Sequence, residues 1–411
     1  MDSATWTERQ RDFAVEYFRS LHGSAAPLPE NQVLQTVFRA LSRQEELGTE
    51  HRDRWGNWEW PFCESSTPDK IYRPWVDELA GEHLPAETRN GGSHRWPKGK
   101  AFAVCLTHDV DQVAPVKPLS RGRRLRDLLG RPNELVRRIK APLKSAVSLL
   151  RGPRGYERPA DFDLGKWLEM EDRFGFRSSF FFFPEEVSAR HEWDCTYRYE
   201  DVVCFQGKPL TVAGMMKVLD ASGWDVGLHG SIKSATTPGV LQDEKQQIEK
   251  VLGHPIIGVR QHYLQYCARR TPLLQAAAGL LVDSTQGYNR SIGFRAGTAF
   301  PYRCWDHERQ MPLSLLEIPQ HVMDGGLFTP NALEYNEEMA VKHCISLMDR
   351  VEKVGGCLTL NWHPDCLDRP LWVRVYQRVL AEAHRRGACG TSAAQIYRWW
   401  IETRMPGQSP A

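Results

Sequence analysis

The residues best suited to chemistry in this sequence come directly after a short apolar run. The run at 101–107 ends in His108, Asp109 and Asp111. Its apolar and β-branched residues predict a buried strand. A pair of carboxylates at the carboxyl end of a parallel strand is typical of the catalytic face of an α/β barrel. Taken alone, the two aspartates could equally well cap a helix or form a turn.

Polar residues end later apolar runs in the same way. They are His229, Arg260, His262, Asp283 and His363, in the runs 224–230, 256–263, 280–285 and 356–364. The carboxyl ends of parallel strands share one face, so we expect these side chains to converge. Any one of the histidines alone would more often be an ordinary core or surface residue, but several coincidences together predict a site.

These residue types favour hydrolysis of an amide or an ester. Two aspartates and two histidines can hold a divalent metal ion with an open position for water. Such an ion acidifies its water and polarises a carbonyl oxygen. A carboxylate can act as general base and a histidine as general acid toward a leaving amine. Arg260 could keep that carboxylate ionised through a charge-assisted pair.

The elements that position these residues alternate along the chain. Strands are expected at 101–107, 178–184, 224–230, 256–263, 280–285, 315–319 and 356–364, with helical patterns between them and two helices at about 370–386 and 392–404. Seven strands with helical crossovers predict a parallel β/α barrel over residues 100–404.

Residues 1–99 differ from the rest and are interpreted as an N-terminal extension or cap. Helical patterns at 8–18 and 33–47 precede a segment rich in tryptophan, with Trp55, Trp58 and Trp60. These rings could stack on sugars, although tryptophan more often fills a core or a domain interface.

A basic insertion is expected at 117–158. Between Lys117 and Arg154 it holds twelve Lys or Arg against two acidic residues. Its amphipathic pattern could lie on an anionic membrane. A solvated surface insertion is the more common structure for such a charge run.

The composition excludes several classes. A net charge of +2 over 411 residues gives no global field for nucleic acid. Ten cysteines without a C-x-x-C pair disfavour a zinc ribbon or a secreted disulfide scaffold. The N-terminus resembles no signal peptide, and no apolar run is long enough to cross a bilayer. We therefore expect a cytoplasmic protein.

Five short motifs resemble, in order, those of the polysaccharide deacetylase superfamily, the NodB homology or carbohydrate esterase family 4 group. They are Thr107-His-Asp-Val-Asp111, Leu228-His-Gly-Ser231, Arg260-Gln-His-Tyr263, Asp283-Ser-Thr285 and Leu360-Asn-Trp-His363. The resemblance covers about residues 100–400. It implies a distorted (β/α)7 barrel and the metal-dependent removal of an N- or O-acetyl group from a sugar.

The resemblance also implies roles for single residues. By motif position, Asp109 is the general base, Arg260 its partner, and His363 the general acid. The backbone N–H of Tyr263 helps to stabilise the oxyanion, and Trp362 lies in the substrate region.

The implied metal, with zinc as first choice, takes Asp111 and His229 as ligands. The family usually supplies a second histidine four residues after the first, but Lys233 stands there. Our hypothesis is that His262 replaces it. A related branch of the family acts on cyclic amides without a metal.

The fourth motif departs from the family pattern as well. The family often has a second aspartate there that orients the acid histidine, and here the position holds Gln286. Asp283 or Asp365 could take over this role, and the sequence leaves the choice open.

Three functions therefore compete. The first is a deacetylase acting on an acetylated carbohydrate, such as a lipid-linked glycan precursor. The second is a hydrolase of a non-sugar cyclic amide on the same barrel. The third is a carbohydrate-binding pseudoenzyme, suggested by Lys233 and Gln286. Asp109 and His363 count against the third, since binding alone needs neither a base nor an acid.

Overall fold

The computed structural model describes residues 6–48, 50–53, 56–84, 96–113, 163–188 and 190–405, which all belong to one compact unit. The basic insertion predicted at 117–158 lies outside the described residues, as do Trp55 and the side chain of Trp60. Membrane contact through this insertion stays a prediction. Within the described part, no helix combines the length and apolar character needed to span a membrane.

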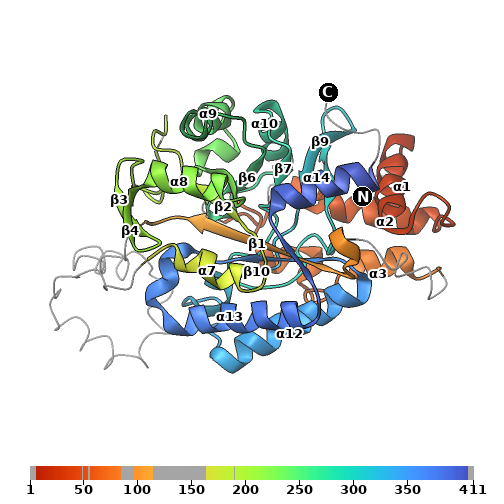
Figure 1. The fold of residues 1–411 in the computed structure, drawn as a ribbon. Coiled ribbons are helices and arrows are strands. Elements are labelled where there is room, and N and C mark those ends of the chain that lie inside the picture. Colours follow the sequence, from red (N-terminus) through yellow and green to blue (C-terminus); the bar gives the residue numbers. More distant parts are fainter. Residues whose placement is uncertain are drawn as a thin grey trace, which may run out of the picture. The chain divides into compact units, whose positions relative to one another are not determined.

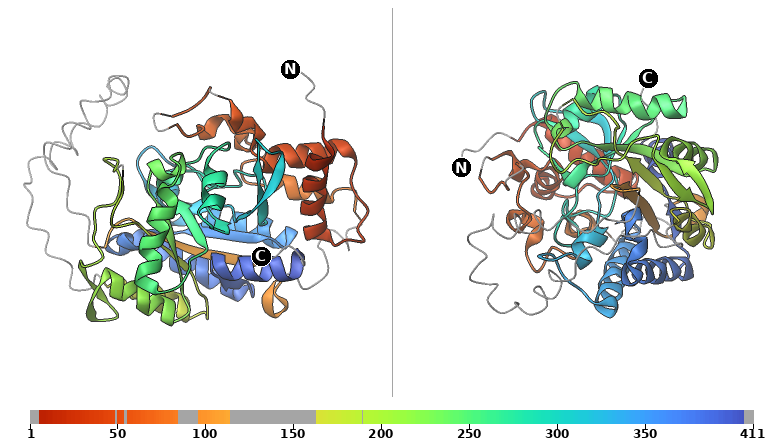
Figure 2. Two further views of the ribbon diagram at one scale, coloured as in Figure 1. Left: turned by 90° about the horizontal axis from the view of Figure 1, so that it is seen from above. Right: turned by 90° about the vertical axis from the view of Figure 1, so that its left-hand side faces the viewer.

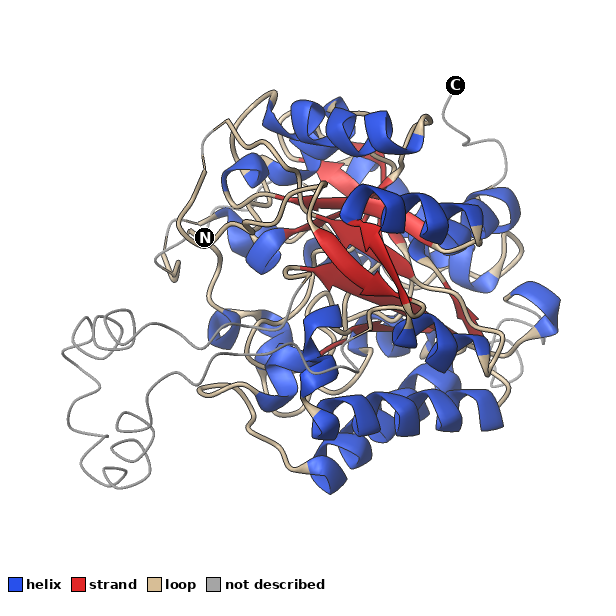
Figure 3. Ribbon diagram, turned by 60° about the vertical axis from the view of Figure 1, so that its left-hand side comes forward, coloured by secondary structure: helices blue, strands red, loops and turns tan. Residues whose placement is uncertain are grey.

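One large sheet lies at the centre of this unit, and helices lie outside it (Figure 3). Nine of its ten strands follow the order β10-β11-β1-β2-β5-β6-β7-β9-β8, and β12 pairs with β1. The bounds are β1 Ala103–Val110, β2 Ser179–Phe182, β5 Asp225–Gly230, β6 Gly258–Gln261, β7 Val282–Asp283, β8 Tyr302–Asp306, β9 Met311–Glu317, β10 Val322–Met323, β11 Cys357–Asn361 and β12 Cys389–Thr391. Every pairing is parallel except that of β8 with β9.

The prediction of an α/β fold with a mostly parallel sheet is confirmed. All seven expected strands are present, as β1, β2, β5, β6, β7, β9 and β11. The count of seven in a closed (β/α)7 barrel is not confirmed. Strands β8, β10 and β12 join the same sheet, and β10 and β8 stand at its two ends in the described pairing order. Strands of two or three residues, such as β10 and β12, are too short to leave a period-two pattern in the sequence.

Strand β1 is central to the site and is buried at all eight positions. Strand β11 pairs with it on one edge. On the other edge β12 pairs with residues 103–105 and β2 with residues 107–110. The strand is longer than expected, so His108 and Asp109 lie within it and only Asp111 follows it. Two polar side chains on a buried strand need partners inside the protein.

The helices are α1 Glu8–His22, α2 Asn31–Leu41, α3 Trp75–Gly81, α7 Lys166–Asp172, α8 Val212–Ala221, α9 Val240–Leu252, α10 Thr271–Ala277, α11 Asp324–Phe328, α12 Glu337–Val354, α13 Pro370–Arg385 and α14 Ala393–Arg404. Helices α12 and α13 pack side by side (Figure 1). A separate antiparallel hairpin pairs β3 Val202–Phe205 with β4 Lys208–Thr211. Side chains at the helix starts satisfy free N–H groups, as where Asn336 accepts from the backbone of Met339 to begin α12.

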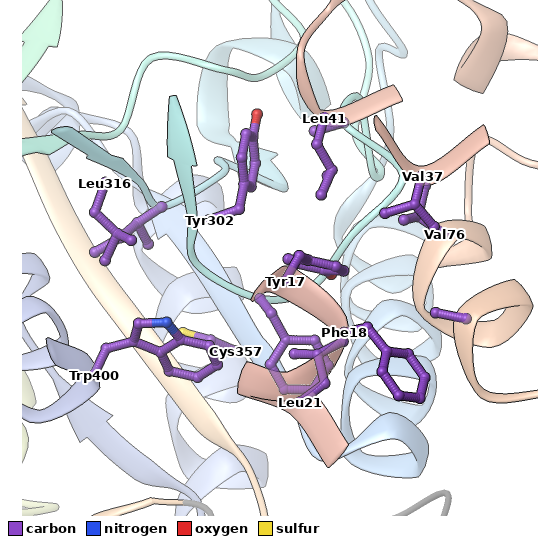
Figure 4. Close-up of a cluster of buried hydrophobic side chains, with 14 of the residues drawn as sticks. Tyr17, Phe18, Leu21, Val37, Leu41, Val76, Tyr302, Leu316, Cys357 and Trp400 are labelled. Carbon is purple, nitrogen blue, oxygen red and sulfur yellow. The ribbon is translucent and has the colours of Figure 1, made fainter. Parts of the chain in front are cut away.

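The N-terminal helices pack beside β8 and β9, as two further views show (Figure 2). Buried side chains of α1, α2 and α3 form one cluster with those of β8, β9, β11 and α14 (Figure 4). A polar contact lies in the same region, where Asp77 accepts from the Tyr17 hydroxyl and from the backbone N–H of Ala299. The range expected as an extension therefore shares its hydrophobic core with the sheet.

From this shared core we predict how two substitutions change the free energy of unfolding. Phe18 is 1% exposed within the cluster, so Phe18→Ala should lower the free energy of unfolding by ~3–5 kcal/mol. The control is Phe62→Ala in the same extension, because Phe62 is 48% exposed and should change stability by under about 0.5 kcal/mol. Denaturant unfolding measures both, and a separate early transition confined to the extension in Phe18→Ala would contradict the shared core.

Candidate active site

A pocket of about 410 Å³ opens at the carboxyl ends of the strands. Its lining there comprises Asp109, Asp111, His229, His262, Tyr263 and His363. Six residues expected from sequence therefore meet at one cavity, although the sequence separates them by up to 254 positions. A cavity of this size is typical of small-molecule sites.

Two histidine nitrogens converge on one carboxylate oxygen of Asp111. Its Oδ1 lies 3.1 Å from His229 Nε2 and 3.4 Å from His262 Nδ1, and these two nitrogens are 2.9 Å apart. The other ring nitrogen of each histidine faces a backbone carbonyl at 2.9 Å, that of Arg260 for His229 and that of Trp193 for His262. A carbonyl only accepts, so each of these outer nitrogens carries its proton.

The consequence is an excess of hydrogen-bond acceptors around Asp111. In a neutral histidine the second nitrogen has a lone pair, so two lone pairs and a carboxylate would face one another. The arrangement therefore needs positive charge. Burial lowers the pKa of His262, but the charge of Asp111 outweighs it and the net pKa is raised. Burial raises the pKa of Asp111, but His262, His229 and His363 together hold it well below its usual value. A metal ion would supply the same positive charge.

Asp109 is held by a second group of residues. Asn361, at the end of β11, donates to Oδ2 at 2.7 Å, and Arg260 Nε lies 3.5 Å from Oδ1. The guanidinium is fully buried and also donates to Thr107, Ser284 and Gln320. The predicted pairing of Asp109 with Arg260 is thus present as an ion pair. Asn361 was not singled out from sequence, although it lies two residues before His363 in the same motif.

His363 is oriented by a residue that the sequence did not reveal. Asp324, at the start of α11 directly after β10, binds His363 twice, through Nδ1 at 2.6 Å and through the backbone N–H at 2.8 Å. Burial lowers the pKa of His363, but Asp324 and the nearby Asp111 and Asp109 raise it well above its usual value. The partner of His363 is therefore Asp324 rather than Asp283 or Asp365. The only available sequence signal was an aspartate after two apolar residues, Val322 and Met323.

Asp283 lies elsewhere. It is fully buried in β7, where it accepts from the Thr285 hydroxyl and interacts with Glu317 of β9. Burial and the charge of Asp283 raise the pKa of Glu317 well above its usual value, and burial also raises the pKa of Asp283. Glu317 thus keeps a proton and donates it to Asp283. Neither residue of this pair is among those that line the pocket.

Tyr263 and Leu264 have φ of 55° and 50°, in the left-handed region that non-glycine residues rarely adopt. Asn289 donates to the Tyr263 carbonyl at 2.9 Å and helps to hold this conformation. Backbone strain of this kind is common at functional sites. Tyr263 lines the pocket, and its expected role beside the substrate stays a prediction.

Trp362 has a different environment. Its ring is fully buried, packs on Tyr376 at 5.2 Å between centroids, and donates to the Trp372 carbonyl. A side chain held in this way serves the core behind the pocket. Lys233 is exposed on a short turn of 3-10 helix at Lys233–Ala235, and the Gln286 side chain is fully buried.

His108, which directly precedes Asp109 in the first motif, supports β1 from its other face. Its Nδ1 faces the Trp362 carbonyl at 2.7 Å and its Nε2 faces Glu171 at 2.8 Å. Burial raises the pKa of Glu171, but the hydrogen bond and charge of His108 outweigh it and lower the pKa. His108 is thus held between the Trp362 carbonyl and the Glu171 carboxylate, both buried within the protein.

The N-terminal extension contributes one wall of the pocket. The residues involved are Asp53, Asn57, Trp58, Glu59 and Pro61. Asn57 fixes this wall by accepting from the backbone N–H of Tyr266 at 2.8 Å. Trp58 is mostly buried against Cys63, Ile71 and Tyr288. Its main role is therefore to fill a hydrophobic core, as is common for tryptophan.

Solved structures with similar folds include two named as polysaccharide deacetylases and one allantoinase. The first, from Mycobacterium smegmatis, is 18% identical and the match covers 77% of this chain and 96% of that one, with a TM-score of 0.47. Puue allantoinase is 16% identical over 77% and 96%, with a TM-score of 0.46. The third, from Pseudomonas aeruginosa PAO1, is 14% identical over 78% and 98%, with a TM-score of 0.44. No family model and no curated protein matches the sequence. Likeness at this level assigns this chain neither a family nor a substrate.

The His363–Asp324 pair predicts a change in titration. Asp324→Asn should lower the pKa of the His363 imidazole, because the nearest negative charge is removed. The matched variant Asp365→Asn should lower it less. NMR titration of the imidazole in chelator-treated protein measures both, and equal shifts in the two variants would contradict the assignment of Asp324.

The buried carboxyl pair predicts a pH dependence of stability. Because the pKa of Glu317 is raised, the folded protein keeps a proton that the unfolded chain releases above about pH 4.3. The resulting stability is complete below that pH and is lost as the pH rises toward the folded pKa. Glu317→Gln stays uncharged, so it should flatten this fall in the free energy of unfolding as the pH rises above about 4.3. The exposed variant Glu308→Gln should leave the slope unchanged, and an unchanged slope in Glu317→Gln would refute the shared proton.

Proposed function

We propose that this protein is a metal-dependent hydrolase that removes an N- or O-acetyl group from a sugar or glycan precursor. One observation carries the proposal. Asp111, His229 and His262 meet within 3.4 Å of one another at the pocket that Asp109 and His363 also line. The order of the five sequence motifs supports the same conclusion.

The residues fit a divalent metal ion. Asp111 Oδ1, His229 Nε2 and His262 Nδ1 are separated by 2.9–3.4 Å, close to the edge of about 3.4 Å expected for a tetrahedral site with bonds of about 2.1 Å. The backbone carbonyls on the outer nitrogens fix the ring orientations, as is usual for metal-bound histidines. His262 would thus take the place left by Lys233. When bound, zinc or a similar ion would polarise the acetyl carbonyl and acidify water.

Asp109 is placed to act as the general base. Asn361 and Arg260 hold its two oxygens, and the carboxylate can accept a proton from the attacking water. The water oxygen bonds to the acetyl carbon. The backbone N–H of Tyr263 would donate to the oxygen that gains negative charge.

His363 is placed to act as the general acid. Its raised pKa keeps it protonated near neutral pH, so it can give a proton to the leaving nitrogen or oxygen as the bond to the acetyl carbon breaks. Asp324 fixes the ring and stabilises its charge. The products are acetate and the free amine or hydroxyl, and the proton taken by Asp109 is returned to solvent.

A second function on the same groups is hydrolysis of a small non-sugar amide. The extension walls one side of the pocket, and a cavity of about 410 Å³ suits a compact substrate as well as a sugar unit. A panel of N-acetylhexosamines and cyclic imides separates the two. The excess of acceptors at Asp111 favours a metal-dependent reaction in either case.

The proposal predicts the metal content of matched variants. Purified wild type should hold about one divalent ion per chain, and His229→Ala and His262→Ala should each weaken binding at least about tenfold and lose acetate release from N-acetylated oligosaccharides. Lys233→Ala should keep both, because this side chain is exposed. Elemental analysis and an acetate assay measure the outcome.

Three results would count against parts of the proposal. Unchanged metal affinity in His262→Ala would show that His262 is no ligand. Hydrolysis without bound metal would move the function to a metal-independent amidohydrolase. Sugar binding with intact Asp109 and His363 but no turnover of any acetylated or cyclic amide substrate would favour a binding protein.

A further inference from the structure

Cys195 lies beside Asp111 and His262, two of the three metal-binding candidates, in the loop between β2 and β3. The residue is 7% exposed and its Sγ lies 3.8 Å from Asp111 Oδ1. Cys195 was not among the residues selected from the sequence, although His191 precedes it by four positions.

The loop that carries Cys195 is fixed to the site on both sides of this residue. The carbonyl of Trp193 faces His262 Nε2 at 2.9 Å, and Asp194 accepts from the backbone N–H of Ile232 at 3.2 Å. The hydroxyl of Tyr197 accepts from the backbone N–H of Phe183 at 2.7 Å. The sulfur is therefore held in place beside Asp111 by the same loop that orients His262.

The separations suit coordination. Ligand atoms of Asp111, Cys195 and His262 all lie within 4.8 Å of one another. Zinc bonds of about 2.3 Å to sulfur and about 2.05 Å to oxygen place these two atoms about 3.6 Å apart in a tetrahedral site. The observed 3.8 Å between Sγ and Asp111 Oδ1 is close to this value.

Cys195 is also separate from the surface of the pocket. Among the described residues, Asp111, His229 and His262 line the pocket, and Cys195 is not part of that lining. An ion held by the first three would therefore meet sulfur on its buried side and keep its pocket side open.

A second acidic grouping with a cysteine does not call for a cation. Glu45, Glu46 and Cys63 also lie close together. Arg43 binds both glutamates and Arg295 binds Glu46, so protein cations already balance these carboxylates.

We propose that Cys195 is a fourth protein ligand, which binds the ion as a thiolate and completes a mixed oxygen, nitrogen and sulfur site. The inference rests on the proposed metal-dependent function and deepens it. A thiolate favours zinc and other soft ions over manganese or magnesium. The protein should therefore prefer zinc to manganese more strongly than a site of one aspartate and two histidines does.

Cobalt(II) tests this directly, because it takes zinc sites and shows sulfur-to-metal charge-transfer absorption in the near ultraviolet when a thiolate is bound. Wild type loaded with cobalt should show this band. Cys195→Ser and Cys195→Ala should lose it while still binding cobalt through Asp111 and the histidines, and should bind zinc at least about tenfold more weakly with a smaller loss for manganese. The control Cys204→Ser, in the hairpin strand β3, should keep the band.

The outcomes separate this inference from the proposed function. Cobalt bound without a charge-transfer band in wild type would refute the sulfur ligand and leave the proposed hydrolase standing. A band that persists in both Cys195 variants would refute it too, because another cysteine would be the source. Absence of any bound metal in wild type would overturn both proposals. Circular dichroism identifies a variant that has lost its fold, and the second substitution then decides.

Discussion

The excess of hydrogen-bond acceptors around Asp111 is the constraint on which the site depends. Each of the two histidines next to it donates its outer N–H to a backbone carbonyl, that of Arg260 for His229 and that of Trp193 for His262. What remains is two lone pairs and a carboxylate within 3.4 Å, which is stable only with positive charge at the centre. A proton on His262 or a metal ion can provide it. The backbone carbonyls thus determine which nitrogen of each ring faces Asp111, and therefore which lone pairs are available to a cation.

Polar groups on the buried strand β1 impose a second constraint. Desolvating a charge costs several kcal/mol unless a partner is present. The strand satisfies this requirement on both faces, with His108 paired to Glu171 on one and Asp109 paired to Arg260 and Asn361 on the other. The first pair stabilises the scaffold and the second leaves a carboxylate at the pocket. One strand can therefore carry structural and reactive charges side by side.

The sequence predicted the seven main strands and six residues of the pocket, because each strand is a distinct apolar run with a polar end. The rest could not be read in this way. Asp324 follows β10, which has two residues and no periodicity, and Cys195 lies in a loop whose path depends on contacts with His262 and Ile232. The wall formed by residues 53–61 depends on tertiary packing, since Asn57 reaches Tyr266 across 209 positions. Short strands, loops and long-range contacts leave no local pattern.

The two departures from the deacetylase motifs bear on whether the site is catalytic. Lys233 and Gln286 stand where the family usually has a metal-binding histidine and an aspartate that orients the acid histidine. A protein that had lost its enzymatic activity would be expected to have no residue in either role. In the proposed function each role has an occupant from another element. His262 faces Asp111 from the end of β6, and Asp324 binds His363 from the end of β10. A site that only binds sugar has no need of an oriented acid or of a third converging acceptor. The replacement of both groups therefore favours retained hydrolytic chemistry over a binding role.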